Sequence, residues 1–258
     1  MFQGGDRIKK TYVGGTEVVK AYKGDKPSIW PVSEVTEIIF IKNGANPSLT
    51  VEFDHHGTNA TTTKPHFYYR VGYSRGIGTV HFDSEDWIDV IGNSITFIPT
   101  TSGNESYTLQ LCGKGNTTIA RSTNDYTTIK VMGNDLYTQA TVICLDKLLD
   151  YDNPPTVLPD YCFYKLLYLD VQQLDCLWGI RTYATTAGNY TFGDFIKKLD
   201  SEGITIDMLN MANRQQTTFN NWIINTNVSD GRIYCPSSLY LEPNSDSGVP
   251  NGWTRIDM

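Results

Sequence analysis

The stretch from Leu158 to Ile223 contains one short pattern three times: Phe163-Tyr-Lys-Leu166-Leu167, Phe192-Gly-Asp-Phe195-Ile196 and Phe219-Asn-Asn-Trp222-Ile223. In each copy an aromatic residue is followed, after two residues, by two apolar residues. The copies start 29 and then 27 residues apart. Repeats of this length are typical of stacked units that close a common core for one another. We therefore predict a repeat core made of Phe163, Leu166, Phe192, Phe195, Phe219 and Trp222.

The apolar spacing within each copy is typical of a helix, and a short apolar run follows each copy as a candidate strand. In the second copy, Thr191-Phe-Gly-Asp194 reads as a capping box and Gly203 as the end of the helix. The composition changes at Asp150–Pro155, and Gly248–Ile256 is placed to cap the last unit. The sequence thus predicts helix-strand units over residues 151–258.

Residues 34–150 carry a series of β signals separated by glycine- and asparagine-rich turns. The apolar and polar residues alternate within them, as in Leu49-Thr-Val51-Glu-Phe53, which places one face in a core and the other in water. Short strands at this spacing favour an Ig-like β-sandwich. The strands are expected at 35–41, 49–53, 67–71, 79–82, 94–98, 107–112, 127–131 and 140–144.

Residues 1–33 are predicted to form an N-terminal β-ribbon of three short strands, with turns at Gly14-Gly15 and Gly24-Asp25. Such a ribbon cannot bury a core of its own, so another surface must cover it. That surface belongs either to another molecule or to this chain's own next domain. The apolar residues expected to dock are Tyr12, Val18, Tyr22, Ile29 and Trp30. The whole chain is then α+β, with domains at 1–33, 34–150 and 151–258.

Composition and charge argue against several classes of function. The 258 residues carry a net charge of -7, which disfavours a nucleic-acid footprint. Residues 1–30 alone hold six Lys/Arg against three Asp/Glu, as expected of a docking segment. No apolar run is long enough to insert into a membrane and no signal-peptide core follows Met1, so we expect synthesis in a cytoplasm. The five cysteines have no C-x-x-C spacing and are interpreted as reduced core residues.

Histidines and carboxylates gather in one part of the predicted sandwich, at His55, His66, His81 and Asp83. Imidazole and carboxylate groups are ordinary transition-metal ligands, so paired strands could bring them to one ion. No specific ligand spacing such as HExxH is present, and Asp83-Ser-Glu85-Asp86 lacks the glycine of a calcium loop. A polar sheet edge and a solvated turn therefore remain the preferred interpretations. We expect no metal, no cofactor and no catalytic residue.

Several stretches resemble known families. Residues 13–30 are similar to a short module common near the ends of phage structural proteins. The remainder resembles BspA-type leucine-rich-repeat proteins of gut Bacteroidales and their phages. That resemblance rests on Lys130–Asp135 with Leu148-Leu149, on Leu158–Tyr168, and on Gly248–Ile256. It implies a sandwich followed by repeats, although three units are few for that family and its asparagine ladder is missing.

Two hypotheses of different classes follow. In the first, the protein is a non-enzymatic virion component, a head or tail fibre or capsid decoration. It would dock on capsid or tail proteins through its N-terminus, form a dimer or trimer, and present a surface to a host glycan or protein. In the second, it is a carbohydrate-active or metal-dependent surface enzyme that uses the His55, His66, His81 and Asp83 cluster. A spacer without a ligand is a milder form of the first hypothesis.

Overall fold

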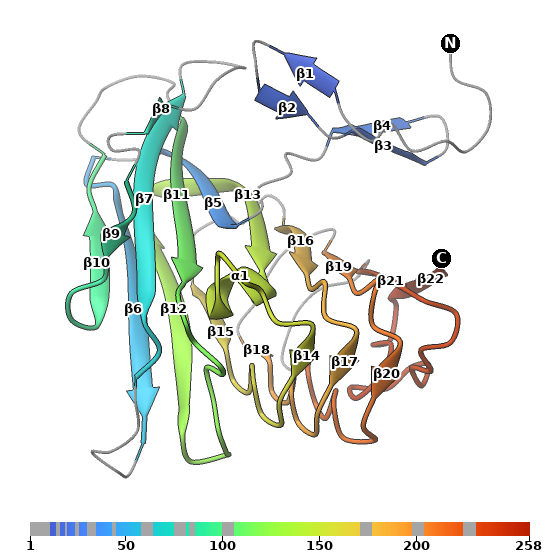
Figure 1. Cartoon of the computed structure of the whole chain (residues 1–258). Coiled ribbons are helices and arrows are strands. Elements are labelled where there is room, and N and C mark those ends of the chain that lie inside the picture. The colour runs from blue at the N-terminus through green and yellow to red at the C-terminus, as the bar shows by residue number, and fades with distance from the viewer. Residues whose placement is uncertain are drawn as a thin grey trace. The chain divides into compact units, whose positions relative to one another are not determined.

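A computed structural model gives the fold (Figure 1). Its contacts divide the chain into two compact units, Met1–Glu34 and Val35–Met258. The residues that the structure describes are 11–13, 16–18, 20–23, 26–29, 35–42, 45–57, 64–74, 81–82, 86–99, 106–170, 177–197, 204–223 and 231–258.

The N-terminal unit contains two antiparallel hairpins. Strand β1 (Thr11–Val13) pairs with β2 (Thr16–Val18), and β3 (Lys20–Lys23) pairs with β4 (Lys26–Ile29). The described residues thus contain four strands in two pairs, where the sequence predicted three strands in one ribbon. Of the predicted docking residues, Tyr12, Val18, Tyr22 and Ile29 lie in these strands. Their side chains, and the whole of Trp30, fall outside the described part of the chain.

The second unit begins with two sheets that share a core. Its strands up to residue 144 are β5 (Thr36–Lys42), β6 (Ser48–His56), β7 (Phe67–Ser74), β8 (His81–Phe82), β9 (Ile88–Asp89), β10 (Ser94–Phe97), β11 (Ser106–Gly113), β12 (Tyr126–Asn134) and β13 (Leu136–Cys144). Each of the eight strands expected from alternation is present, and β9 is an addition. The alternation works as expected in β6, where Leu49, Val51 and Phe53 are buried and the residues between them are partly exposed. Phe53 stacks on Phe67 of the facing sheet at 4.6 Å between ring centroids.

The repeat region is also β structure. Its strands are β14 (Val157–Leu158), β15 (Leu167–Asp170), β16 (Leu177–Arg181), β17 (Thr186–Ala187), β18 (Ile196–Lys197), β19 (Thr205–Asp207), β20 (Asn213–Arg214), β21 (Arg232–Cys235) and β22 (Thr254–Asp257). They pair in parallel, β14-β17-β20 in one sheet, β15-β18 in a second and β16-β19-β21-β22 in a third. The first two units, β14 to β16 and β17 to β19, each place one strand in each sheet. The third unit adds β20 and β21 to two of the sheets and meets the remaining one through an isolated bridge, Ile196 to Ile223. The chain therefore winds as a three-sided solenoid.

The predicted helices are therefore wrong, and so is the α+β class of helix-strand units. Within the described residues the one α-helix is α1 (Leu145–Leu149), which lies outside the repeats. The three aromatic patterns lie in turns instead, closed by bonds such as Leu166 N–H to Phe163 O at 3.3 Å and Trp222 N–H to Phe219 O at 3.3 Å. A tight turn brings residues i and i+3 to one side, as a helix does. The apolar spacing therefore could not distinguish a turn from a helix.

Backbone hydrogen bonds between successive units explain why the turn is preferred. The N–H of Phe163 donates to Thr191 O at 2.8 Å, and the N–H of Phe192 donates to Thr218 O at 2.9 Å. Thr191, the expected helix cap, donates its hydroxyl to Pro159 O at 2.9 Å. Since buried backbone groups must be paired, bonds to the neighbouring unit replace the bonds of a helix.

A left-handed residue ends each turn at the same repeat position. Lys165, Asp194 and Asn221 have φ of 51°, 46° and 49°. A right-handed helix excludes such values, and Asn and Asp tolerate them better than most residues. The repeated left-handed position therefore terminates the turn and directs the chain into the following strand.

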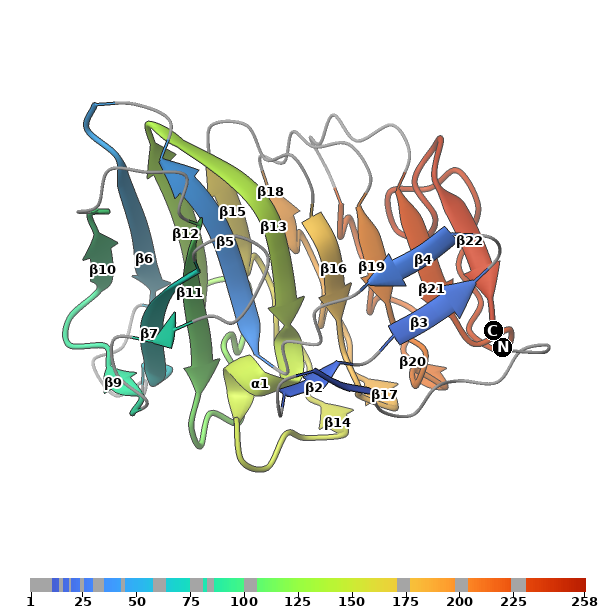
Figure 2. The same ribbon diagram turned by 90° about the horizontal axis from the view of Figure 1, so that it is seen from above.

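The sheets of the first part continue into the solenoid (Figure 2). Strand β12 is antiparallel to β6 on one side and parallel to β15 on the other. Strand β13 is likewise antiparallel to β5 and parallel to β16. The result is a 5-stranded sheet and a 10-stranded sheet, both of which cross the expected boundary at residue 150 without interruption.

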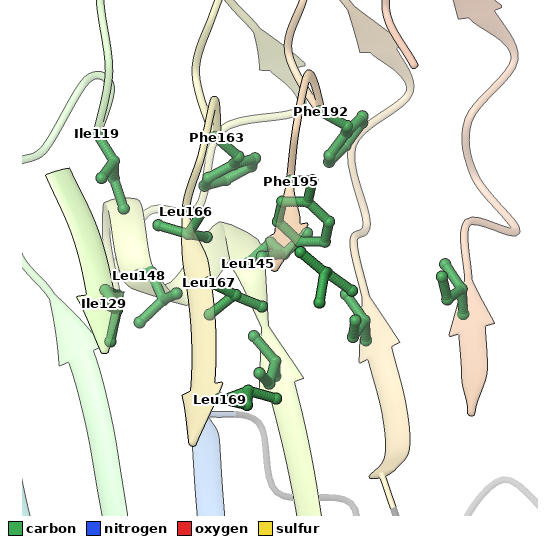
Figure 3. Packing of buried hydrophobic residues seen from close by; sticks show 14 of the residues in the cluster. Ile119, Ile129, Leu145, Leu148, Phe163, Leu166, Leu167, Leu169, Phe192 and Phe195 are labelled. Atoms are coloured by element: carbon green, nitrogen blue, oxygen red, sulfur yellow. The ribbon is translucent and has the colours of Figure 1, made fainter. Parts of the chain in front are cut away.

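The core is continuous in the same way. The rings of Phe163, Phe192 and Phe219 stack in register, with centroids 5.9 and 5.2 Å apart. Figure 3 shows Phe195 next to Leu145 of α1, with Phe163 and Phe192 further along the same core. All six residues predicted for the repeat core are buried, with exposed fractions of 2% or less: Phe163, Leu166, Phe192, Phe195, Phe219 and Trp222.

Candidate functional site

The predicted histidine cluster divides between two sheets. His55 lies on β6, and its Nδ1 is 3.1 Å from the Thr127 hydroxyl. His66 precedes β7, and its Nε2 is 2.7 Å from Asp89 Oδ1, with both side chains 49% exposed. The side chain of His81 and the whole of Asp83 fall outside the described residues. Among the residues that are described, no group of three or more His, Cys, Asp or Glu could hold a metal ion.

A small cavity adjoins His55. It measures about 30 Å³ and is lined by residues that include Phe53, Phe67 and Asn93. A cavity of this size has room for a few water molecules at most. The cavity can therefore hydrate His55, but it is too small for a sugar or a peptide.

A group of interacting aromatic and charged side chains lies elsewhere, on the 5-stranded sheet and the turns that follow it. We call it the Tyr126 cluster. It consists of Asp54, His56, Tyr126, Lys130, Tyr161, Tyr164, Lys165, Tyr190 and Asp194. The register of β12 against β6 pairs Tyr126 with His56. The parallel pairing of β12 with β15 brings the turn before β15 alongside, and the next unit adds Tyr190 and Asp194.

The rings of this cluster pack on one another. Tyr126 stacks on His56 at 4.6 Å and meets the edge of Tyr164 at 5.8 Å. Tyr161 stacks on Tyr190 at 5.2 Å with an interplanar angle of 7°. These stacked and edge-to-face contacts hold the rings in fixed positions relative to one another.

Charges of both signs lie between the rings. The Lys165 ammonium is 5.1 Å from the Tyr126 ring centroid and 5.2 Å from that of Tyr164. Asp54 accepts a hydrogen bond from Lys130, which is the main reason that the pKa of Asp54 is lowered. The carboxylate of Asp54 is also 3.0 Å from His56 Nε2.

The tyrosines are poor candidates for acid-base work. Burial raises the pKa of Tyr164 to about 12, and the nearby Asp194 carboxylate acts in the same direction. The Tyr164 hydroxyl donates to Asp194 at 3.1 Å. Burial also raises the pKa of Tyr126. Both phenols therefore stay protonated at neutral pH, which suits hydrogen bonding to a ligand and not proton abstraction.

Sequence reasoning did not find the Tyr126 cluster. One signal was available, since Tyr161 and Tyr190 occupy the same position two residues before Phe163 and Phe192. Tyr126 carries no comparable signal, because its neighbours come from strands far along the chain.

Comparison with known proteins does not add a relative. No family model, no curated protein and no solved structure matches this chain. In the described part of the chain, no helix is long and apolar enough to cross a membrane.

Proposed function

We propose that the protein is a structural and binding component of a phage virion, a head or tail fibre or decoration. Its N-terminal segment docks on capsid or tail proteins, and the body from residue 35 presents the Tyr126 cluster to a host-surface glycan or protein. The assignment to a virion rests on the resemblance of residues 13–30 to modules of phage structural proteins.

The observation that carries the proposal is the division of the chain at residue 34. The first 34 residues make their contacts largely among themselves, whereas residues 35–258 form one large unit. Two-stranded hairpins of three or four residues are marginally stable alone. A basic segment with little core of its own gains stability on a partner surface, which is the behaviour expected of a docking element.

The chemistry of the body favours binding over catalysis. The Tyr126 cluster offers protonated phenols and charges of both signs on a firmly paired sheet. His55 and His66 are each engaged with a separate partner, Thr127 and Asp89. The described residues therefore supply no observation that favours the alternative enzyme.

The test is incorporation into particles. Phage would be produced with the full chain, with residues 35–258 alone, and with a full chain carrying Lys165→Ala, and purified particles would be analysed by mass spectrometry. We expect the full chain and Lys165→Ala in particles at equal levels and the truncated chain to be absent. Equal incorporation of the truncated chain would refute the docking role.

Host binding is tested with the same particles. Lys165→Ala removes the cation between Tyr126 and Tyr164 but no buried core contact, so particles should form normally and adsorb to host cells less well. A matched control, Lys114→Ala, alters an exposed lysine on the loop after β11. Unchanged adsorption of Lys165→Ala particles would rule out the Tyr126 cluster as the host-binding surface.

A further inference from the structure

Strand β10 forms the outer edge of the 5-stranded sheet (Figures 1 and 2). It is antiparallel to β6, with Ser94 opposite Glu52 and Phe97 opposite Leu49. Just before the strand, Phe53 N–H donates to Asn93 O at 2.7 Å.

That bond fixes which backbone groups point outward. Hydrogen-bonded residues alternate along an antiparallel strand, so Asn93, Ile95 and Phe97 direct their N–H and C=O groups to β6. Ser94 and Thr96 direct theirs away from the sheet, and Ile98 continues this series. The Ser94 and Thr96 side chains are exposed and Ile95 is buried. Among the described residues no strand pairs with the outward side of β10.

The residues of this edge strand carry no charge of their own. Pro99 stands just after the strand, and Lys64 Nζ donates to Asn93 Oδ1 at 3.4 Å just before it. Proteins commonly place charges on exposed edge strands to prevent association. Residues 90–101 contain no Asp, Glu, Lys, Arg or His. The strands that end the same two sheets elsewhere each carry a charged or titratable residue: Lys197 in β18, His81 in β8, Asp89 in β9, and Arg255 with Asp257 in β22.

Exposed aliphatic side chains stand on both sides of β10 in the sequence, the first of them on β9 of the facing sheet. Ile88 is 43% exposed, Ile91 is 90% exposed and Ile98 is 62% exposed. Three isoleucines of this exposure within eleven residues mark a surface suited to contact with another protein.

We propose that β10 pairs with β10 of a second copy of this chain, antiparallel and across a two-fold axis at Thr96. In a two-fold interface both copies use the same surface patch, so each contact between two residues occurs twice. With Thr96 on the axis, Ser94 of one copy lies opposite Ile98 of the other. All three outward-facing residues then form hydrogen-bonded pairs, and the two 5-stranded sheets become one.

Charge explains why a second copy is the occupant. The chain carries a net charge of -7, so two copies repel one another over most orientations. The β10 edge carries no charged residue over twelve positions. The nearest cation, Lys64, bonds Asn93 three residues from the axis, so the two copies of Lys64 lie at opposite ends of the paired strands. Pairing through one short strand and its neighbouring isoleucines buries less area than a standard stable interface, so we expect a reversible dimer. The inference concerns the body alone and does not depend on attachment to a virion.

The experiment is sedimentation of the purified full chain over about a hundredfold range of concentration, where mass action separates monomer from dimer. We expect a concentration-dependent dimer for the native sequence. Thr96→Lys sets two cations against each other on the axis and should abolish the dimer. The control Thr254→Lys adds the same charge to the exposed edge strand β22 and should leave the dimer intact. Circular dichroism would establish that both variants fold.

A second variant tests the position of the axis. Residues opposite one another in a hydrogen-bonded pair have Cα atoms about 5.5 Å apart, which a disulfide can span. Thr96→Cys should therefore form a disulfide-linked dimer on mild oxidation, and Thr254→Cys should not. The proposal is overturned by a native chain that stays monomeric throughout, by a Thr96→Lys dimer, or by failure of Thr96→Cys to cross-link.

Discussion

Truncation of the central ring of the solenoid tests the repeat core most directly. Phe192 is 2% exposed and lies between Phe163 and Phe219, with the edge of Phe195 at 5.6 Å between centroids. Replacing a buried Phe by Ala typically costs about 3 to 5 kcal/mol. Because three ring contacts are lost together, we expect Phe192→Ala to lower the free energy of unfolding by about 5 kcal/mol, the upper end of this range.

The assay is equilibrium denaturation followed by far-UV circular dichroism and by tryptophan fluorescence. Since both sheets cross from β12 and β13 into the solenoid, the two signals should change in one transition. A loss of about 5 kcal/mol lowers the Tm of a body of this size by roughly 10 to 20 °C. The control is Tyr240→Ala, which alters an aromatic side chain that is 66% exposed and should change stability by less than about 0.5 kcal/mol.

A loss below about 2 kcal/mol for Phe192→Ala would contradict the stacked core, because so small a cost is outside the usual range for a buried Phe. Two separate transitions would contradict cooperation between the sandwich and the solenoid.

Three further predictions concern local features. Lys130→Met should lower stability at neutral pH by about 0.2 to 1 kcal/mol, as for other partly exposed ion pairs. The pKa of Asp54 is depressed below its ordinary value of 3.8, so this stabilisation is present above that pH and lost as the pH falls through the folded pKa; thermal melts at neutral and strongly acidic pH check it, and an equal loss at both would contradict it. Gly231→Ala should destabilise the C-terminal end by about 1 to 3 kcal/mol, since a Cβ there would lie 2.1 Å from the Trp253 ring; tryptophan fluorescence during denaturation measures it, and a native-like midpoint would refute the contact. The four described cysteines are buried, so a thiol reagent should modify them only after unfolding, and rapid reaction of more than one thiol in the native protein would show that the core is open.

How far the sequence predicts this fold depends on whether the signal is local. Alternation in Leu49–Phe53 located β6 because side chains on one face of a strand recur every two residues. The repeat was also visible, and its aromatic and apolar members are buried as a set. The turn was mistaken for a helix because Phe163 and Leu166 come together in either structure. The left-handed Lys165 gave no warning, since lysine is not a residue typical of that conformation.

Features that depend on strand pairing were not predictable. The Tyr126 cluster exists because β12 has β6 on one side and β15 on the other, and those pairings join residues tens of positions apart. No periodicity within a single strand encodes its neighbours. The same limit applies to His55 and His66, which would have come together only if their neighbouring predicted strands paired. His55 lies on β6 of the 5-stranded sheet, and His66 lies just before β7 of the 10-stranded sheet.

The double pairing of β12 and β13 has a consequence for the dimensions of such a protein. Each strand accepts an antiparallel partner on one edge and a parallel partner on the other. Neither sheet therefore requires a fixed number of solenoid units after β13. Inserting or removing one unit of 27 or 29 residues would move the C-terminal end by one strand spacing, about 4.8 Å. Residues 35–144 and the final strand would keep their own neighbours. The distance between the two ends of the body can therefore change in steps of one coil while the surfaces at both ends stay the same.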